Sequence, residues 1–193
     1  ATRLVTLLDN HDLDRRIMSE ILDRVHHWDC DLAKEIMKLC MTFLLTTRGI
    51  PQIYYGTEIG MTGYQDPDNR RDMPWQLFDQ DLNPVPGYEK EIFEHVKHLI
   101  AIRKQNPAIA SGYLITLYCD IFVYAYMRIF KNNVLIVTIN NGLQPMPTAL
   151  PIQINANTNI PSRIKALLGE GVIVKSLLES HGDVQVQGGK IKV

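Results

Sequence analysis

The sequence predicts an α/β region followed by an all-β region, and two observations carry this prediction. Before about residue 107, short β-prone runs alternate with apolar residues at helical spacing, which is typical of βαβ units around a parallel sheet. After residue 107, short β-prone runs follow one another closely, which is typical of an antiparallel sandwich. We therefore predict two domains, at residues 1–107 and 108–193.

The α/β region begins with a strand over residues 3–8, whose apolar run ends in a cluster of short polar side chains. A short helical pattern follows over residues 14–25. A longer helical pattern covers residues 31–48, and either Asp29 or Asp31 can cap its start.

Gly49 supplies the left-handed backbone position that ends this long helix. Residues 51–56 form a second β-prone run, so the sequence predicts a parallel strand pair with a right-handed crossover. Tyr54 and Tyr55 are adjacent on this predicted strand and would point to opposite faces. Residues 56–86 form a long polar loop, and a loop of this length in a compact domain is usually functional or disordered.

A third helix is predicted over residues 86–105, ended by Asn106 and Pro107. Hairpin turns are predicted at residues 131–133 and 188–189. The all-β region contains seven β-prone runs, at residues 112–118, 121–129, 134–140, 148–154, 164–168, 184–187 and 190–193.

Composition excludes several classes of protein. The 193 residues are 46% hydrophobic and 21% charged with a net charge of −1, which gives no electrostatic case for nucleic acid or an anionic membrane. No apolar run reaches the roughly 20 residues that cross a bilayer. The three cysteines make no disulfide framework, and no CxxC or HxxxH pattern predicts a metal site.

Three polar clusters can carry chemistry. The sequence DNHD at residues 9–12 places a His–Asp pair at a strand end, where it could bind sugar hydroxyls, or it could be only a turn and a helix cap. The tyrosines in GIPQIYYGTE at residues 49–58 could stack on a sugar or simply pack. The arginines in DPDNRRDMPW at residues 66–75 could bind substrate or pin their own loop through Asp–Arg pairs.

Taken in order, LLDNHD at residues 7–12, GIPQIYYGTE and DPDNRRDMPW resemble the C-terminal part of the α-amylase family of glycoside hydrolases. The likeness is nearest to the neopullulanase and cyclomaltodextrinase branch. The resemblance implies the C-terminal part of a TIM (β/α)8 barrel over residues 1–107, with strands seven and eight and their helices. An antiparallel β-sandwich, called domain C, would follow over residues 108–193.

The resemblance also implies roles for individual residues. Asp12 matches the family's third catalytic carboxylate, which stabilises the oxocarbenium-like transition state. His11 matches the histidine that binds the same sugar ring, and Arg70 and Arg71 match the loop arginines near that subsite. Tyr55 is expected to contribute a sugar-binding ring and hydroxyl. No metal ligands are expected among these residues.

The implied parent enzyme cleaves α-1,4 bonds of α-glucans or maltooligosaccharides with retention, and activity on α-1,6 bonds stays open. No cofactor is expected, and calcium is left open for the part of the parent N-terminal to this chain. No nucleic acid or membrane partner is expected, while a homo-oligomer and the choice between a cytoplasmic and a periplasmic or secreted location stay open.

Retaining glycosidases need a nucleophile and a general acid/base roughly 5 Å apart. In the family these come from strands four and five, which the chain lacks, so we expect the chain alone to be inactive. Three alternatives remain: a non-catalytic amylase-like scaffold, a free-standing carbohydrate-binding β-sandwich, and a transglycosylase of the same fold.

Overall fold

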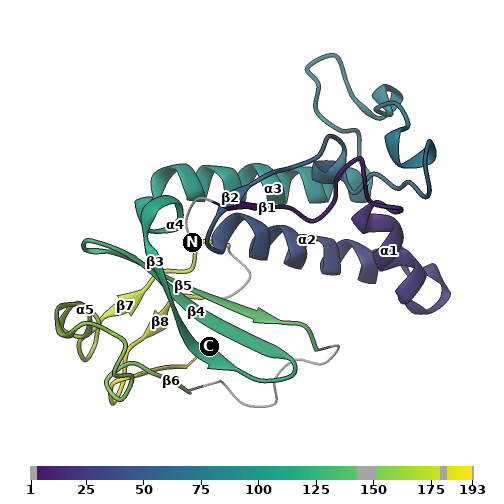
Figure 1. Ribbon diagram of the computed structural model, residues 1–193. Coiled ribbons are helices and arrows are strands. Elements are labelled where there is room, and N and C mark those ends of the chain that lie inside the picture. Colours follow the sequence, from purple (N-terminus) through teal and green to yellow (C-terminus); the bar gives the residue numbers. More distant parts are fainter. Residues whose placement is uncertain (1–3, 143–150, 179–181, 193) are drawn as a thin grey trace. The chain divides into compact units, whose positions relative to one another are not determined.

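A computed structural model of the chain describes residues 4–142, 151–178 and 182–192 (Figure 1). The chain divides into two compact units, Ala1–Gln105 and Asn106–Val193. No helix in the described ranges is both long and apolar enough to cross a membrane.

The first unit mixes helices with a short parallel sheet, which confirms the predicted βαβ unit. Val5 lies opposite Ile50 and Thr6 lies opposite Pro51. The elements are β1 (Val5–Thr6), α1 (Ile17–Arg24), α2 (Cys30–Thr46), β2 (Ile50–Pro51) and α3 (Tyr88–Gln105), with 3₁₀ turns at His26–Trp28, Thr57–Ile59, Asp68–Arg70 and Trp75–Leu77. Strand β1 is shorter than the predicted strand over residues 3–8, and β2 shares only Pro51 with the predicted run over residues 51–56.

Helix α2 begins at a cap that its sequence predicts, but it ends at Thr46 and not at residue 48, with Thr47 in an extended conformation at its C-cap in place of Gly49. Of the two candidate caps, Asp29 is the one used, since its carboxylate accepts the Leu32 N–H at 3.0 Å. Beyond the helix, Gly49 has φ +113°, and a Cβ there would stand 2.8 Å from Thr6 Cγ2. Glycine is therefore required for the chain to pass close to β1 and pair with it.

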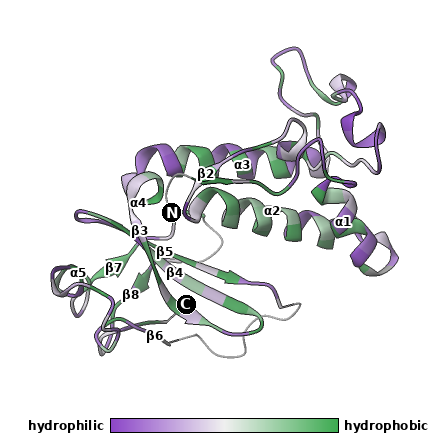
Figure 2. Cartoon of the chain, viewed as in Figure 1, coloured by the Kyte–Doolittle hydropathy of each residue, from purple (hydrophilic) through white to green (hydrophobic). Residues whose placement is uncertain are grey.

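Helices α2 and α3 lie side by side and bury apolar stripes against each other, while the segment between β2 and α3 is mostly hydrophilic (Figures 1 and 2). At their contact, Thr42 Oγ1 lies 2.9 Å from His95 Nε2. Lys34 and Lys38 both pair with Glu91 across the interface. The buried apolar residues of the two helices are Ala33, Met37, Met41, Leu44, Leu45, Ile92, Val96, Leu99 and Ile102.

The second unit is built around antiparallel strands. Strands β3 (Tyr113–Cys119), β4 (Val123–Phe130) and β5 (Asn133–Asn140) form one sheet. The hairpin turn between β4 and β5 occurs at Lys131 as predicted. The remaining elements are the pairs β6 (Pro151–Gln153) with β9 (Lys190–Lys192) and β7 (Ile173–Val174) with β8 (Val184–Gln185), and the helices α4 (Pro107–Ser111) and α5 (Ser162–Leu167).

The strand predicted over residues 164–168 is wrong, because these residues lie mainly in helix α5. Ile164 and Leu168 are both buried in the core of this unit, and a spacing of four residues places them on one helical face. The sequence analysis also missed β7 and the short helix α4, which Pro107 opens. Of the predicted strand 148–154, residues 148–150 lie outside the described ranges.

Candidate functional site

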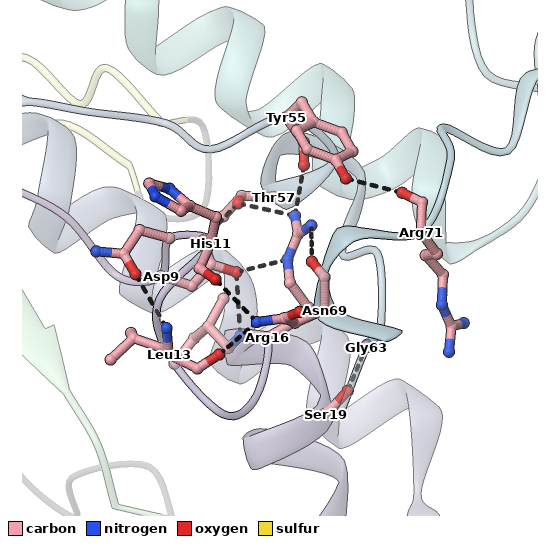
Figure 3. A network of polar contacts seen from close by, with 12 residues as sticks. Asp9, His11, Leu13, Arg16, Ser19, Tyr55, Thr57, Gly63, Asn69 and Arg71 are labelled. Atoms are coloured by element: carbon pink, nitrogen blue, oxygen red, sulfur yellow. Dashed lines mark hydrogen bonds and ion pairs between the residues drawn. The ribbon is translucent and has the colours of Figure 1, made fainter. Parts of the chain in front are cut away.

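Arg16 is the centre of a buried polar network in the first unit (Figure 3). Its side chain is fully buried, and its Nε donates to Asp9 Oδ2 at 3.0 Å. Its Nη2 donates to the Tyr55 carbonyl, and its Nη1 reaches the Asn69 carbonyl at 3.4 Å. One guanidinium therefore ties together the ends of both strands and the loop that follows β2.

Asp9 is the acceptor of this network. Its carboxylate, 1% exposed, accepts the Ile17 N–H at 3.1 Å and the Thr57 hydroxyl at 2.6 Å in addition to Arg16. Ile17 is the first residue of α1, where a negative charge is favourable. With its hydrogen bonds satisfied inside the fold, Asp9 is a structural carboxylate beneath the strand end.

The residues that follow Asp9 turn outward. The Asn10 side chain accepts the N–H groups of Asp12 and Leu13 at 2.9 and 3.1 Å, which is the turn that the DNHD sequence predicts. The His11 Nε2 and Asp12 Oδ1 atoms are 3.2 Å apart, and their side chains are 57% and 70% exposed. The structure therefore brings the two predicted sugar-binding side chains together, close in the chain to the buried Asp9–Arg16 ion pair.

Tyr54 and Tyr55 do not lie on a strand, so the prediction that they point to opposite faces is wrong. Strand β2 ends at Pro51, and the two rings meet edge to face with centroids 4.5 Å apart. Both rings lie over Arg16, with its Cζ 4.4 Å from the Tyr54 centroid and 5.3 Å from the Tyr55 centroid. The Tyr54 ring also lies 6.4 Å from the His11 ring, centroid to centroid.

The two loop arginines pair within their own loop. Arg70 Nε lies 2.9 Å from Asp66 Oδ1, and Arg71 pairs with Asp68. The Arg71 carbonyl accepts the Tyr55 hydroxyl at 2.8 Å, while the Arg71 side chain points away from Arg16 in Figure 3. Both guanidinium groups are half-exposed, and neither belongs to the buried network around Arg16.

A carboxyl group that the sequence analysis did not single out, that of Glu58, lines the same groove as Tyr55. The groove has a volume of about 570 Å³, and its other walls are apolar side chains and lysine stems of α3 and Ile53. The Glu58 Oε2 atom is buried without a hydrogen-bond partner among the described residues. Burial raises the pKa of the Glu58 carboxyl, although the N–H groups of Glu58 and Gly56 oppose this effect.

Sequence reasoning found His11 and Asp12 but missed the contribution of Arg16, Thr57 and Asn69. Apart from Asp9, which lies seven residues from Arg16, the hydrogen-bond partners of their side chains lie 39 to 58 residues away along the chain. One signal was available: Arg16 immediately precedes the apolar face of α1, and a charged residue at such a position is buried only when it is paired.

No group of three or more His, Cys, Asp or Glu side chains that could hold a metal ion occurs within the described ranges. The site consists of polar and aromatic side chains at the carboxyl end of a parallel strand pair. This arrangement defines a βα protein with a polar site at its strand ends, as in enzymes built on parallel sheets.

Comparisons with known proteins show which family the chain resembles. Residues 1–88 match the family model described as "Alpha amylase, catalytic domain". A cyclomaltodextrin glucanotransferase from Bacillus licheniformis is 35% identical over 180 residues, which are 92% of this chain and 21% of the relative. A cyclomaltodextrinase from Thermoanaerobacter pseudethanolicus is 43% identical over 106 residues, 55% of this chain and 17% of the relative.

Solved structures agree with the sequence comparisons. An Anoxybacillus α-amylase superposes with a TM-score of 0.74 at 25% identity, covering 100% of this chain and 35% of that protein. The chain belongs to the α-amylase family. It spans about a fifth of the length of the two curated relatives named above.

Proposed function

We propose that this chain is the C-terminal part of an α-amylase-family enzyme that cleaves α-1,4 bonds of α-glucans. Residues 1–107 would form the last strands and helices of its (β/α)8 barrel, and residues 108–193 its domain C. Exposed apolar side chains on and beside the two strands support this proposal. Leu4, Val5 and Ile50 are each more than half exposed, and neighbouring strands of a complete barrel would cover them.

The observation that carries the proposal is that the exposed His11–Asp12 pair directly follows Asp9, which is buried in an ion pair with Arg16. In the proposed reaction, Asp12 accepts hydrogen bonds from hydroxyls of the sugar at the cleavage site. These bonds strengthen as the ring flattens and gains positive charge, so the carboxylate lowers the barrier. His11 binds a hydroxyl of the same ring.

The other proposed substrate-binding residues are Tyr55, Arg70 and Arg71. Tyr55 offers a ring that is pinned through its hydroxyl to the loop. Each arginine is already paired with a loop aspartate, so binding of a sugar by Arg70 would require it to share or leave Asp66.

The nucleophile and the general acid/base would come from a part of the parent protein outside these 193 residues. The relatives support this, because the matched segment is 21% of the first and 17% of the second. We propose no cofactor for the residues present, α-glucans or maltooligosaccharides as the substrates, and no nucleic acid or membrane partner.

A second candidate is a transglycosylase, in which a sugar hydroxyl replaces water as the acceptor. The relative that aligns with 92% of this chain is a glucanotransferase, and this alignment favours the candidate. Both candidates use His11 and Asp12 in the same way, because the acceptor enters only after the first bond is broken.

The test is an assay of the purified 193-residue chain for release of reducing sugar from maltodextrin, cyclodextrin and pullulan. We expect no turnover from the chain or from Asp12→Asn. Turnover by the wild-type chain that Asp12→Asn abolishes would contradict the proposal, since the nucleophile would then be present. Turnover that is unchanged in Asp12→Asn would identify a contaminating glycosidase.

A further inference from the structure

We propose that Asn69 is a positioning residue for His11 and Asp12. This inference rests on the proposed function, because it concerns how the proposed sugar-binding residues His11 and Asp12 are positioned. Asn69 is neither exposed nor charged, so it cannot contact the substrate itself. Its role would be to fix the backbone from which the two side chains project.

The contacts of the Asn69 amide are the first line of support. Its Nδ2 donates to the His11 carbonyl at 3.1 Å and to the Leu13 carbonyl at 2.8 Å. Both carbonyl groups flank Asp12, whose own N–H is held by Asn10. Figure 3 shows the Asn69 side chain between His11 and Leu13. The backbone of residues 11–13 is thus fixed by the side chains of Asn69 and Asn10 instead of by a strand or a helix.

Asn69 can act as a reference point because it is itself immobilised. It is 2% exposed and lies in the 3₁₀ turn Asp68–Arg70. The Arg16 guanidinium approaches its carbonyl, and Gly63 packs so closely that a Cβ there would stand 3.0 Å from Asn69 Cα. The loop after β2 therefore holds the loop after β1 through a rigid contact.

The direction of these hydrogen bonds makes the inference specific. Both partners of Nδ2 are carbonyl oxygens, so only a group with two N–H donors fits between them. Aspartate has the same shape as asparagine but would place a carboxylate oxygen against both carbonyls. Asn69→Asp should therefore displace residues 11–13 without creating a cavity.

Three variants of the full 193-residue chain test the proposal by amide NMR and by titration with maltotetraose. Asn69→Asp removes the donors and adds charge, Asn69→Ala removes the donors alone, and Gln65→Glu makes the same amide-to-acid change on an exposed side chain of the same loop. We expect the amide resonances of residues 11–13 to move in both Asn69 variants. Amides of α2, α3 and the second unit should stay in place.

Maltotetraose affinity should fall about tenfold in the Asn69 variants and stay unchanged in Gln65→Glu. Resonances of residues 11–13 that stay in place in Asn69→Ala would overturn the proposal, as would unchanged affinity once the loop has moved. If Asn69→Asp does not fold, Asn69→Ala decides by the same criteria. If wild-type chain binds no sugar while the loop still moves, the positioning of the loop stands and the proposed sugar site fails.

Discussion

At the scale of single residues, the buried pair Asp9–Arg16 is the feature on which the site depends. Two charges removed from water stabilise a fold only when their geometry is good and their remaining hydrogen bonds are made. Asp9 meets this condition with three donors, and Arg16 with acceptors on both strand ends and the following loop. The pair therefore specifies how the loops sit relative to the strands.

Breaking this pair should cost far more than breaking an exposed one. We expect Arg16→Met to lower the free energy of unfolding of the first unit by about 3–5 kcal/mol, because the Asp9 carboxylate would stay buried without its partner. Urea unfolding followed by tryptophan fluorescence measures this, since both tryptophans, Trp28 and Trp75, lie in the first unit.

Arg24→Met is the matched control for this experiment. Arg24 pairs with Glu20 on the surface of α1, where an ion pair contributes about 0–1 kcal/mol. Equal losses in the two variants would show that the Asp9–Arg16 pair has no special part in the fold.

We expect the Glu58 carboxyl to contribute more to the stability of the first unit at low pH, where it is protonated, than at neutral pH. Its folded pKa is raised by burial, so the folded state holds the proton more tightly than the unfolded chain. The resulting stability is present below the unfolded pKa and is lost as pH rises through the folded pKa. Glu58→Gln should therefore raise the melting temperature at pH 7 and leave it almost unchanged at pH 4.

Glu94→Gln, on the exposed side of α3, controls for the loss of a negative charge. Thermal melts at the two pH values measure both variants. A stabilisation by Glu58→Gln that is the same at pH 4 and pH 7 would contradict the assignment of this effect to ionisation.

At the scale of the elements, we expect the contact between α2 and α3 to weaken in acid, because it contains His95. His95 is held between Thr42 and the Lys38 carbonyl, and burial lowers the pKa of its imidazole. The unfolded chain then takes up a proton at a higher pH than the folded state. The stability from a neutral His95 is complete above the unfolded pKa and falls as pH drops toward the folded pKa.

We therefore expect His95 to lower the unfolding free energy of the first unit between pH 7 and pH 5, opposite in sign to the contribution of Glu58, and His95→Gln to remove this part of the dependence. Tryptophan-detected urea unfolding at several pH values provides the measurement. His98→Gln, at an exposed position of the same helix whose charge also acts on His95, should change the slope less than His95→Gln does. A slope that stays the same in His95→Gln would remove His95 as its cause.

The elements also show what sequence can and cannot predict. The cap at Asp29 and the parallel pairing of β1 with β2 follow from local signals and were predictable. Gly49 has the predicted positive φ, but it lies at the approach to β1 and does not end α2. The short reach of β2, which leaves Tyr54 and Tyr55 in a turn, is set by the partner strand and by Arg16. Residues 164–168 were misassigned because a short apolar run does not distinguish a strand from a buried helix.

The same division holds for the site. His11 and Asp12 could be found because they follow an apolar run in a recognisable sequence. Asn69 could not be assigned a role, since its hydrogen-bond partners lie 56 and 58 residues earlier in the chain. A contact of this kind appears only when the loops have been brought together.

At the scale of the whole molecule, the chain joins a site-bearing α/β unit to a β-rich unit and belongs to the α-amylase family. The proposed function assigns the sugar contact to one strand end, while bond cleavage would need carboxylates from outside the chain. If the proposal holds, sugar binding and turnover are separable, and binding is the property that the chain itself should retain.

Titration of the ¹⁵N-labelled chain with maltotetraose, read by amide NMR, tests this claim most directly. We predict shifts centred on residues 11 and 12 with a dissociation constant in the millimolar range (about −4 kcal/mol). Affinity should fall about tenfold in Asp12→Asn and stay unchanged in Asp14→Asn, the exposed neighbour in the same loop. Shifts confined to other parts of the chain, or equal affinity of wild type and Asp12→Asn, would contradict the account.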